Sequence, residues 1–289
     1  MAERERRETA PRLAGHAAAA VRQLDPDRWL TALFAPDARR ADLLALYAFN
    51  IEIARIPEQV REPALGDIRR QWWRDTVAAA FAGQAPRGHP VAEALQRAIR
   101  VHDLPQAPFT RLLEARAADF GPPPARIEDL EAYAQGTAAS LSALALRILG
   151  VADAPSQTAA EATAIGFALI GLIRAVPFHA AARRLYLPQT LLAAQGLDAE
   201  AAFGGAPAPA LRRVIEQVAD RAAGYLAAAR SARGEVSRAA LPVLLLGTLA
   251  ELYLKRLKQS GFDPASPRLA VGIPRKQITL LLRAGLGRF

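Results

Sequence analysis

An arginine cluster in the middle of the chain has residue types and a spacing suited to binding an anionic group. Arg174, Arg183 and Arg184 lie with Tyr186 in an apolar helical pattern, LIRAVPFHAAARRLYLP, over residues 172–188. Arginine presents a planar fork of N–H donors, which can hold a phosphate or carboxylate with two hydrogen bonds. We therefore expect these residues to bind a diphosphate or a phospholipid headgroup, or otherwise to form a solvated helix face.

Patterns for metal binding or nucleophilic catalysis are weaker. Glu52 and Glu58 could ligate a metal, but acids in such positions are more often solvated or paired with a nearby arginine, here Arg55 or Arg61. His179 has no second histidine at metal-ligand spacing. The other histidines are His16, His89 and His102. The chain also has no cysteine, no Gly-x-Ser-x-Gly elbow and no glycine-rich phosphate loop. We therefore expect no metal site, no cofactor and no disulfide.

The elements that must position these residues are helices. Apolar residues make up 52% of the 289-residue chain and are mostly alanine and leucine, which favour helices, whereas β-branched and aromatic residues are sparse. This composition predicts an all-α fold with an ample core. We expect one domain over residues 12–289 after a flexible, charged lead-in at residues 1–11.

Helical periodicity and breaker residues set the expected elements. Asp25-Pro26 has the form of a helix cap, and Pro57 should end or kink a helix. In the amphipathic segment 64–81, Ile68, Trp72 and Val77 should face inward. Helices are expected over residues 13–24, 28–34, 36–56, 64–81, 91–102, 109–120, 127–149, 158–182, 210–230 and 238–260, followed by an apolar tail over 272–289.

The charge pattern narrows the classes of partner. The formal net charge is +9, and nearly all of the excess is arginine. No zinc-finger spacing or basic-region heptad accompanies it, so we expect no nucleic acid partner. The start of the chain lacks the apolar core of a secretory signal, and the run 241–250 is too short to span a bilayer. We therefore expect a cytoplasmic protein with, at most, peripheral membrane contact; its tail could lie on a membrane or pack on the bundle.

Several motifs in order along the chain resemble the squalene/phytoene synthase family. They are Tyr47-Ala48-Phe49, Trp73, Asp119, Tyr133 with Gly136-Thr137, Arg174, Arg184-Leu185-Tyr186-Leu187-Pro188 and Tyr253. The resemblance spans about residues 12–285 and implies an isoprenoid-synthase-type helical bundle around a central cavity. The residues that it places along this cavity are Tyr47, Phe49, Gly136, Thr137, Phe178 and Tyr253.

The aspartate-rich motifs of that family are largely missing. The family holds magnesium and a substrate diphosphate with aspartates on two helices, because magnesium prefers oxygen ligands. The first motif falls on Ala54, Arg55 and Glu58, and the second on Arg174, Ala175 and His179. One acid remains, and Arg55 adds a fixed positive charge where a metal would bind. Both motifs are therefore interpreted as vestigial.

The form of the second motif, LIRAVPFH before the arginines and Tyr-Leu-Pro, resembles the branch of the family that assists assembly of mitochondrial respiratory complex I, and that branch's bacterial relatives. The resemblance implies a non-catalytic assembly or interaction factor at the bacterial inner membrane, with complex I subunits or assembly intermediates as partners. One alternative is a prenyl transferase with an altered site, which would need Mg²⁺. Another is a protein that binds an isoprenoid or a phospholipid.

Overall fold

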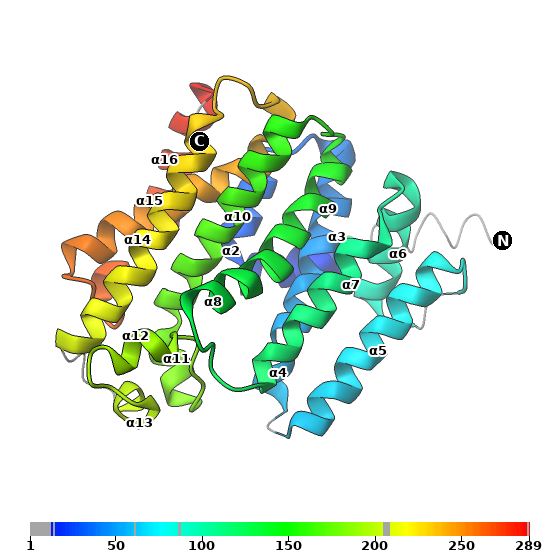
Figure 1. Ribbon diagram of the computed structural model, residues 1–289. Helices are drawn as coiled ribbons and strands as arrows, with labels where there is room; N and C mark the ends of the chain where they lie inside the picture. Colours follow the sequence, from blue (N-terminus) through cyan, green and yellow to red (C-terminus); the bar gives the residue numbers. More distant parts are fainter. Residues whose placement is uncertain (1–12, 14, 61, 86–87, 205–208, 288) are drawn as a thin grey trace.

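Helix α10 (Ala154–Arg174) packs between helices on several sides and forms the middle of the bundle (Figure 1). It begins where the Asp153 carboxylate accepts a hydrogen bond from the backbone N–H of Ser156 at 2.8 Å. Gly166 allows the later helix that contains Leu226 to come close, because a Cβ at Gly166 would lie 2.9 Å from that side chain. Small residues thus let α10 serve as a core helix.

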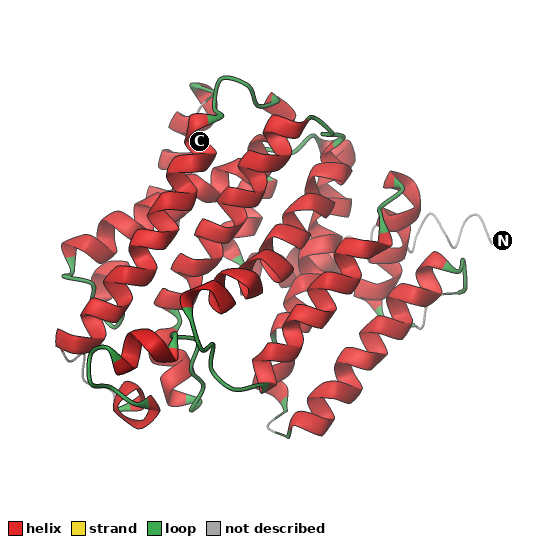
Figure 2. Cartoon of the chain, viewed as in Figure 1, coloured by secondary structure: helices red, strands yellow, loops and turns green. Residues whose placement is uncertain are grey.

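The computed structural model describes residues 13, 15–60, 62–85, 88–204, 209–287 and 289, and every regular element in them is helical (Figure 2). The prediction of an all-α fold is confirmed. The expected lead-in over residues 1–11 lies outside the described residues. Residues 15–24 are helical, and before α10 there follow α2 (Pro26–Ala32), α3 (Asp37–Ala54), α4 (Ile56–Gln59), α5 (Pro63–Phe81), α6 (Pro90–His102), α7 (Gln106–Ala115), η1 (Arg116–Phe120), α8 (Ile127–Ala134), η2 (Gln135–Ala139) and α9 (Ser140–Leu149).

The second half of the chain adds long helices that pack against α10 and a group of short helices at one end. Buried apolar side chains from both halves join in one connected core. After α10 the elements are α11 (Val176–Ala181), α12 (Gln189–Ala193), α13 (Ala199–Phe203), α14 (Pro209–Ser231), η3 (Arg238–Ala240), α15 (Leu241–Gln259), η4 (Pro267–Leu269) and α16 (Ile273–Gly285). In Figure 1, α4, α11, α12 and α13 gather at the lower end of the bundle.

Two core helices end in the same way at the two vestigial motifs. Helix α3 ends at Arg55 with φ −92° and ψ −3°, and α10 ends at Ala175 with φ −86° and ψ −2°. Pro57 and Pro177 follow two residues later, and proline cannot donate the backbone hydrogen bond that would continue a helix. The expected break at Pro57 is confirmed. The expectation of one helix over 158–182 was wrong because Pro177 divides it.

The segment expected as one helix over 127–149 contains a wider, π-type turn, η2, between α8 and α9. Gly136 lies in this turn and faces α7, since a Cβ there would come within 2.6 Å of the Cβ of Ala115. A neighbouring helix therefore fills the space beside this small residue. Such turns reorient the side chains on either side of them.

Helix α5 buries a different face from the predicted one. Trp73 is 4% exposed and Val77 is buried, whereas Ile68 is 64% exposed. Arg70 also lies on the buried face, where it pairs with Asp67. The prediction for Val77 is confirmed, and the one for Ile68 was wrong, because the ring of Trp73 packs edge-on against the core ring of Phe49 at 5.2 Å.

Helix α10 is the one described helix with the length and apolar composition needed to cross a membrane. Neighbouring helices bury 56% of its most apolar 18-residue stretch. A core helix meets the same criterion of length and composition, so the apolar character of α10 is explained by its place in the bundle.

Candidate functional site

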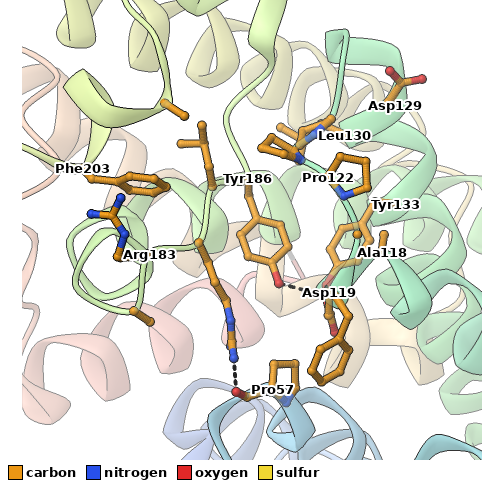
Figure 3. A pocket seen from close by; sticks show the side chains of 18 of the residues that line it. Pro57, Ala118, Asp119, Pro122, Asp129, Leu130, Tyr133, Arg183, Tyr186 and Phe203 are labelled. Carbon is orange, nitrogen blue, oxygen red and sulfur yellow. Dashed lines mark hydrogen bonds between the residues drawn. The ribbon is translucent and has the colours of Figure 1, made fainter. Parts of the chain in front are cut away.

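A cavity of about 1190 Å³ lies at the end of the bundle where α3 and α10 both terminate. Its walls come from α4, the start of α5, η1, α8 and the loop that joins η1 to α8, α11, the segment after α11, and α13 (Figure 3). The lining includes Pro57, Glu58, Asp119, Phe120, Leu130, Tyr133, Phe178, Arg183, Arg184, Tyr186 and Phe203. Apolar walls with a few polar groups suit an amphipathic ligand.

Asp119 is the centre of the polar contacts in this cavity. Its Oδ1 accepts hydrogen bonds from the hydroxyls of Tyr133 at 2.6 Å and Tyr186 at 2.9 Å, the second of which is drawn in Figure 3. Arg116 donates to the Tyr133 hydroxyl at 2.8 Å and lies 3.5 Å from Asp119 Oδ2. Burial, followed by the nearby carboxylate, raises the pKa of Tyr186 well above its ordinary value. Both hydroxyls therefore remain protonated donors that fix the cavity wall.

Two of the predicted anion-binding arginines reach this cavity. The Arg184 guanidinium donates to the Pro57 carbonyl oxygen and so joins the segment after α10 to α4 (Figure 3). Arg183 pairs with Glu200 and lies over the Phe203 ring, with its guanidinium carbon 5.1 Å from the ring centre. Its backbone has φ 52°, a left-handed value that is uncommon for a residue other than glycine. Arg183, Arg184 and Tyr186 therefore share one wall.

His179 lies beside this polar group, with its ring centre 4.5 Å from that of Tyr186. Burial and then the positive charge of Arg184 lower the pKa of His179 from 6.5 to about 4. The imidazole is thus neutral at pH 7. Its Nδ1 is buried and has no hydrogen-bond partner among the described residues.

Arg174 does not join the other two arginines. Its guanidinium carbon lies 3.6 Å from the ring centre of Tyr253, and its Nη1 is 3.5 Å from Asp27 Oδ2. The same carboxylate accepts the Tyr253 hydroxyl at 2.7 Å and Lys276 Nζ at 2.7 Å. Burial and then Asp27 raise the pKa of Tyr253 well above its ordinary value. Arg174, whose side chain is 33% exposed, therefore lies at the edge of a charge cluster whose centre, Asp27, is buried.

The space between α3 and α10 is occupied by a side chain from α2. The Arg28 guanidinium lies 5.7 Å from the ring centre of Tyr47 on α3 and 5.2 Å from that of Phe167 on α10. Asp25 holds it through an ion pair of 2.7 Å. The cavity that the structure shows lies at the ends of these two helices, beyond residues 54 and 174.

The structure places most of the residues expected along the cavity elsewhere. Phe178 lines it and is 55% exposed. The prediction was wrong for three aromatic residues, because the side chains of Tyr47, Phe49 and Tyr253 are buried in the core. The other two, Gly136 and Thr137, lie in the π turn, where Gly136 faces α7 and the Thr137 hydroxyl bonds the Tyr133 carbonyl at 2.7 Å.

The residues at the two motifs do not fit a magnesium site. Ala54 and Ala175 carry no donor atom, and Glu58 pairs with Arg55 at 2.9 Å. Neutral His179 faces Tyr186. Among the described residues, no three histidine, cysteine or acidic side chains come together in a way that could hold a metal ion. Magnesium needs several oxygen ligands in near-octahedral geometry, which this set does not provide.

The charge cluster around Asp27 was not foreseen from the sequence. Asp27 has the appearance of an ordinary acid in the first turn of a helix, and Lys276 is 249 residues away. No local pattern links such residues. Arg116, by contrast, is three residues from Asp119, and this helical spacing could have suggested the pair.

An all-α bundle with a cavity at the ends of two core helices belongs to the isoprenoid-synthase class of folds. The sequence profile of the squalene/phytoene synthase family matches residues 21–277. The chain belongs to this family. It superposes on the crystal structure of squalene synthase HpnC from Alicyclobacillus acidocaldarius with a TM-score of 0.77 and 23% identity, over 88% of this chain and 96% of that one.

Two curated relatives represent two kinds of protein. The chain is 32% identical to NADH dehydrogenase (ubiquinone) complex I, assembly factor 6, of Bos taurus, over 86% of this chain and 75% of the relative. It is 26% identical to presqualene diphosphate synthase of Rhodopseudomonas palustris, over 86% of this chain and 88% of the relative. The resemblance to the family and to its assembly-factor branch is confirmed.

Proposed function

We propose that this protein is a non-catalytic assembly factor for a respiratory NADH:quinone oxidoreductase. The observation that carries the proposal is the chemistry of the two motifs, where Ala54 and Ala175 offer no ligand and Arg55 neutralises Glu58. Metal-assisted ionisation of a diphosphate needs acids from both helices. Similarity to the assembly factor of Bos taurus supports the assembly role in place of catalysis.

The proposal extends to the partners and the location of the protein. Its partners are subunits or assembly intermediates of the oxidoreductase. It acts in the cytoplasm of a bacterium, at the inner surface of the membrane that holds this complex. Both statements rest on the similarity to the assembly factors.

A second candidate function is binding of an isoprenoid diphosphate or a phospholipid. The observation that favours it is the cavity, in which Arg183 and Arg184 stand near Tyr186 and an apolar wall that contains Phe178. A ligand held there could regulate the assembly role without any reaction. The two functions are therefore compatible.

A gene deletion tests the assembly role. Membranes of the deletion strain should lose NADH:quinone oxidoreductase activity and the assembled complex on native gels, while squalene-type and carotenoid lipids remain. The wild-type gene should restore both. A strain that loses these lipids and keeps the oxidoreductase would contradict the proposal and indicate a prenyl transferase.

An assay with purified protein tests catalysis directly. Incubation with farnesyl or geranylgeranyl diphosphate and Mg²⁺ should release no diphosphate and form no C30 or C40 product. Binding of the same ligands without turnover would support the second candidate function. Arg184→Gln should weaken such binding, whereas Arg100→Gln, an exposed arginine at the end of α6, should not.

A further inference from the structure

Helix α16 carries a row of exposed apolar side chains on its outer face. Ile278 is 59% exposed, Leu281 62%, Leu282 64% and Leu286 65%. Their spacing places them on one side of the helix, over more than two turns. Large apolar side chains that gather in this way on a surface mark a site of interaction.

The opposite face of α16 is firmly attached to the bundle. Leu280 is fully buried, and Lys276 forms its buried ion pair with Asp27. Arg233 lies over the ring of Phe289, 5.6 Å from its centre, beyond the end of the helix. The inner face of α16 thus packs on the bundle, and the exposed row is on its outer face.

The segment of the chain that carries this row is strongly basic in sequence. Residues 254–289 contain eight arginines or lysines and one acid, Asp263, and one of these cations, Lys276, is neutralised by its buried ion pair with Asp27. Arg275 lies one turn before Ile278 on the exposed side of α16. Burial and then the charges of Arg233 and Arg283 lower the pKa of Arg230, which pairs with Glu251. The apolar row therefore lies in a region of positive potential.

The positive charge and the exposed apolar area together indicate which kind of partner could cover α16. A second copy would bring two basic regions together, and like charges oppose such a contact. An anionic lipid surface complements both features, since leucine and isoleucine enter the acyl boundary while arginines contact headgroup phosphates. Helices that lie in the membrane interface combine an apolar face with arginine and lysine side chains in this way.

We propose that the outer face of α16 docks the protein on the surface of an anionic membrane. The occupant is the lipid surface, and the contact is peripheral. The inference is independent of the assembly role, because it rests on the exposure and charge of α16 alone. It also differs from ligand binding in the cavity, whose lining includes no residue of α16.

Sedimentation with vesicles tests this docking surface in the full-length protein. The wild type should bind vesicles of mixed phosphatidylcholine and phosphatidylglycerol, bind phosphatidylcholine vesicles far less, and dissociate as salt increases. Leu281→Ser/Leu282→Ser should lower the partition coefficient about tenfold or more, because two inserted side chains are lost. Arg275→Gln should weaken binding to the anionic vesicles only.

A matched control uses exposed apolar residues elsewhere. Leu65→Ser/Ile68→Ser changes side chains of α5 that are 45% and 64% exposed, and it should leave vesicle binding unchanged. Circular dichroism and thermal unfolding should show that both double variants fold as the wild type does. Equal loss of binding in both, equal binding by the wild type and the α16 variant, or no binding to anionic vesicles would overturn the proposal. The last result would instead indicate an acidic protein partner.

Discussion

Two buried aspartates organise the polar side chains of this protein at the residue scale. Asp119 holds Tyr133 and Tyr186 at the cavity, and Asp27 holds Tyr253 and Lys276 inside the bundle. A buried carboxylate is stable only when cations or hydrogen-bond donors compensate for lost hydration. The partners of each aspartate come from separate segments of the chain, so both residues also fix tertiary contacts.

The ion pair between Asp27 and Lys276 should show strong coupling. Asp27→Asn leaves buried Lys276 with an uncompensated charge and should lower the free energy of unfolding by about 3 kcal/mol or more. Lys276→Met should lower the free energy of unfolding by a smaller amount, because Tyr253 and Arg174 still face Asp27. Urea unfolding of the single and double variants measures the coupling. Strictly additive costs would contradict the ion pair.

His179 should make stability depend on pH. Its pKa is 6.5 in the unfolded chain and about 4 in the folded protein, so between these values the unfolded state binds more protons. Stability should therefore fall as the pH drops below 6.5, by about 2 kcal/mol at pH 5.

Urea unfolding at pH 7.5 and pH 5 measures this effect, and His179→Asn should remove it. His16→Asn, at an exposed position near the start of the chain, serves as the control. Identical pH dependence in the wild type and His179→Asn would show that the imidazole titrates normally in the folded protein.

At the scale of elements, proline and glycine decide where helices stop and how closely they pack. Pro57 and Pro177 end α3 and α10 at corresponding places and open the cavity at their ends. The π turn η2 sets the direction of Tyr133 relative to α9, and Gly136 lets that turn contact α7. The site is therefore shaped by interruptions of helices rather than by the helices alone.

Two glycine substitutions separate packing from helix propensity. Gly136→Ala places a methyl group 2.6 Å from the Ala115 Cβ and should destabilise the protein by about 1–3 kcal/mol. Gly224→Ala, on an open face of α14 with no atom within 4 Å, should stabilise it by about 0.5–1 kcal/mol. Thermal unfolding compares the two variants. A neutral or stabilising Gly136→Ala would contradict the close contact between α7 and η2.

At the scale of the whole molecule, the bundle has the family's fold, but its two motifs lack the acidic side chains that would bind a metal ion. The structure superposes on squalene synthase HpnC, yet Arg28 and Arg174 occupy the region between and beside the motif helices. Cationic side chains there oppose a metal ion, because both carry positive charge at short range. The arginines between and beside the motif helices thus disfavour metal-assisted catalysis.

Magnesium should leave the stability of the protein unchanged. A site with a dissociation constant of about 1 mM would add about 1.4 kcal/mol at about 10 mM metal, enough to raise the melting temperature by several degrees. We expect a change below about 1 °C relative to sodium chloride of equal ionic strength. A saturable rise that Glu58→Ala abolishes would show that a metal site is present.

The sequence alone determined the helical class, the cap at Asp25-Pro26, the break at Pro57 and the family. These features depend on local propensity, on proline geometry and on motif order, all of which are read along the chain. The sequence also predicted that Arg174, Arg183, Arg184 and Tyr186 bind an anionic group together. Arg183, Arg184 and Tyr186 are close in the chain, so one short segment brings them to the same wall, whereas Arg174 lies against Asp27 and Tyr253.

Only the tertiary structure decided the partners of the remaining residues. Arg174 turns toward Asp27 because Tyr253 and Lys276, from α15 and α16, complete a buried cluster there. Trp73 instead of Ile68 faces the core because Phe49 of α3 offers an edge-on ring contact. The apolar row of α16 stays outside because its other face supplies Lys276 and Leu280 to the bundle. Such choices depend on contacts between distant helices, and local periodicity cannot encode them.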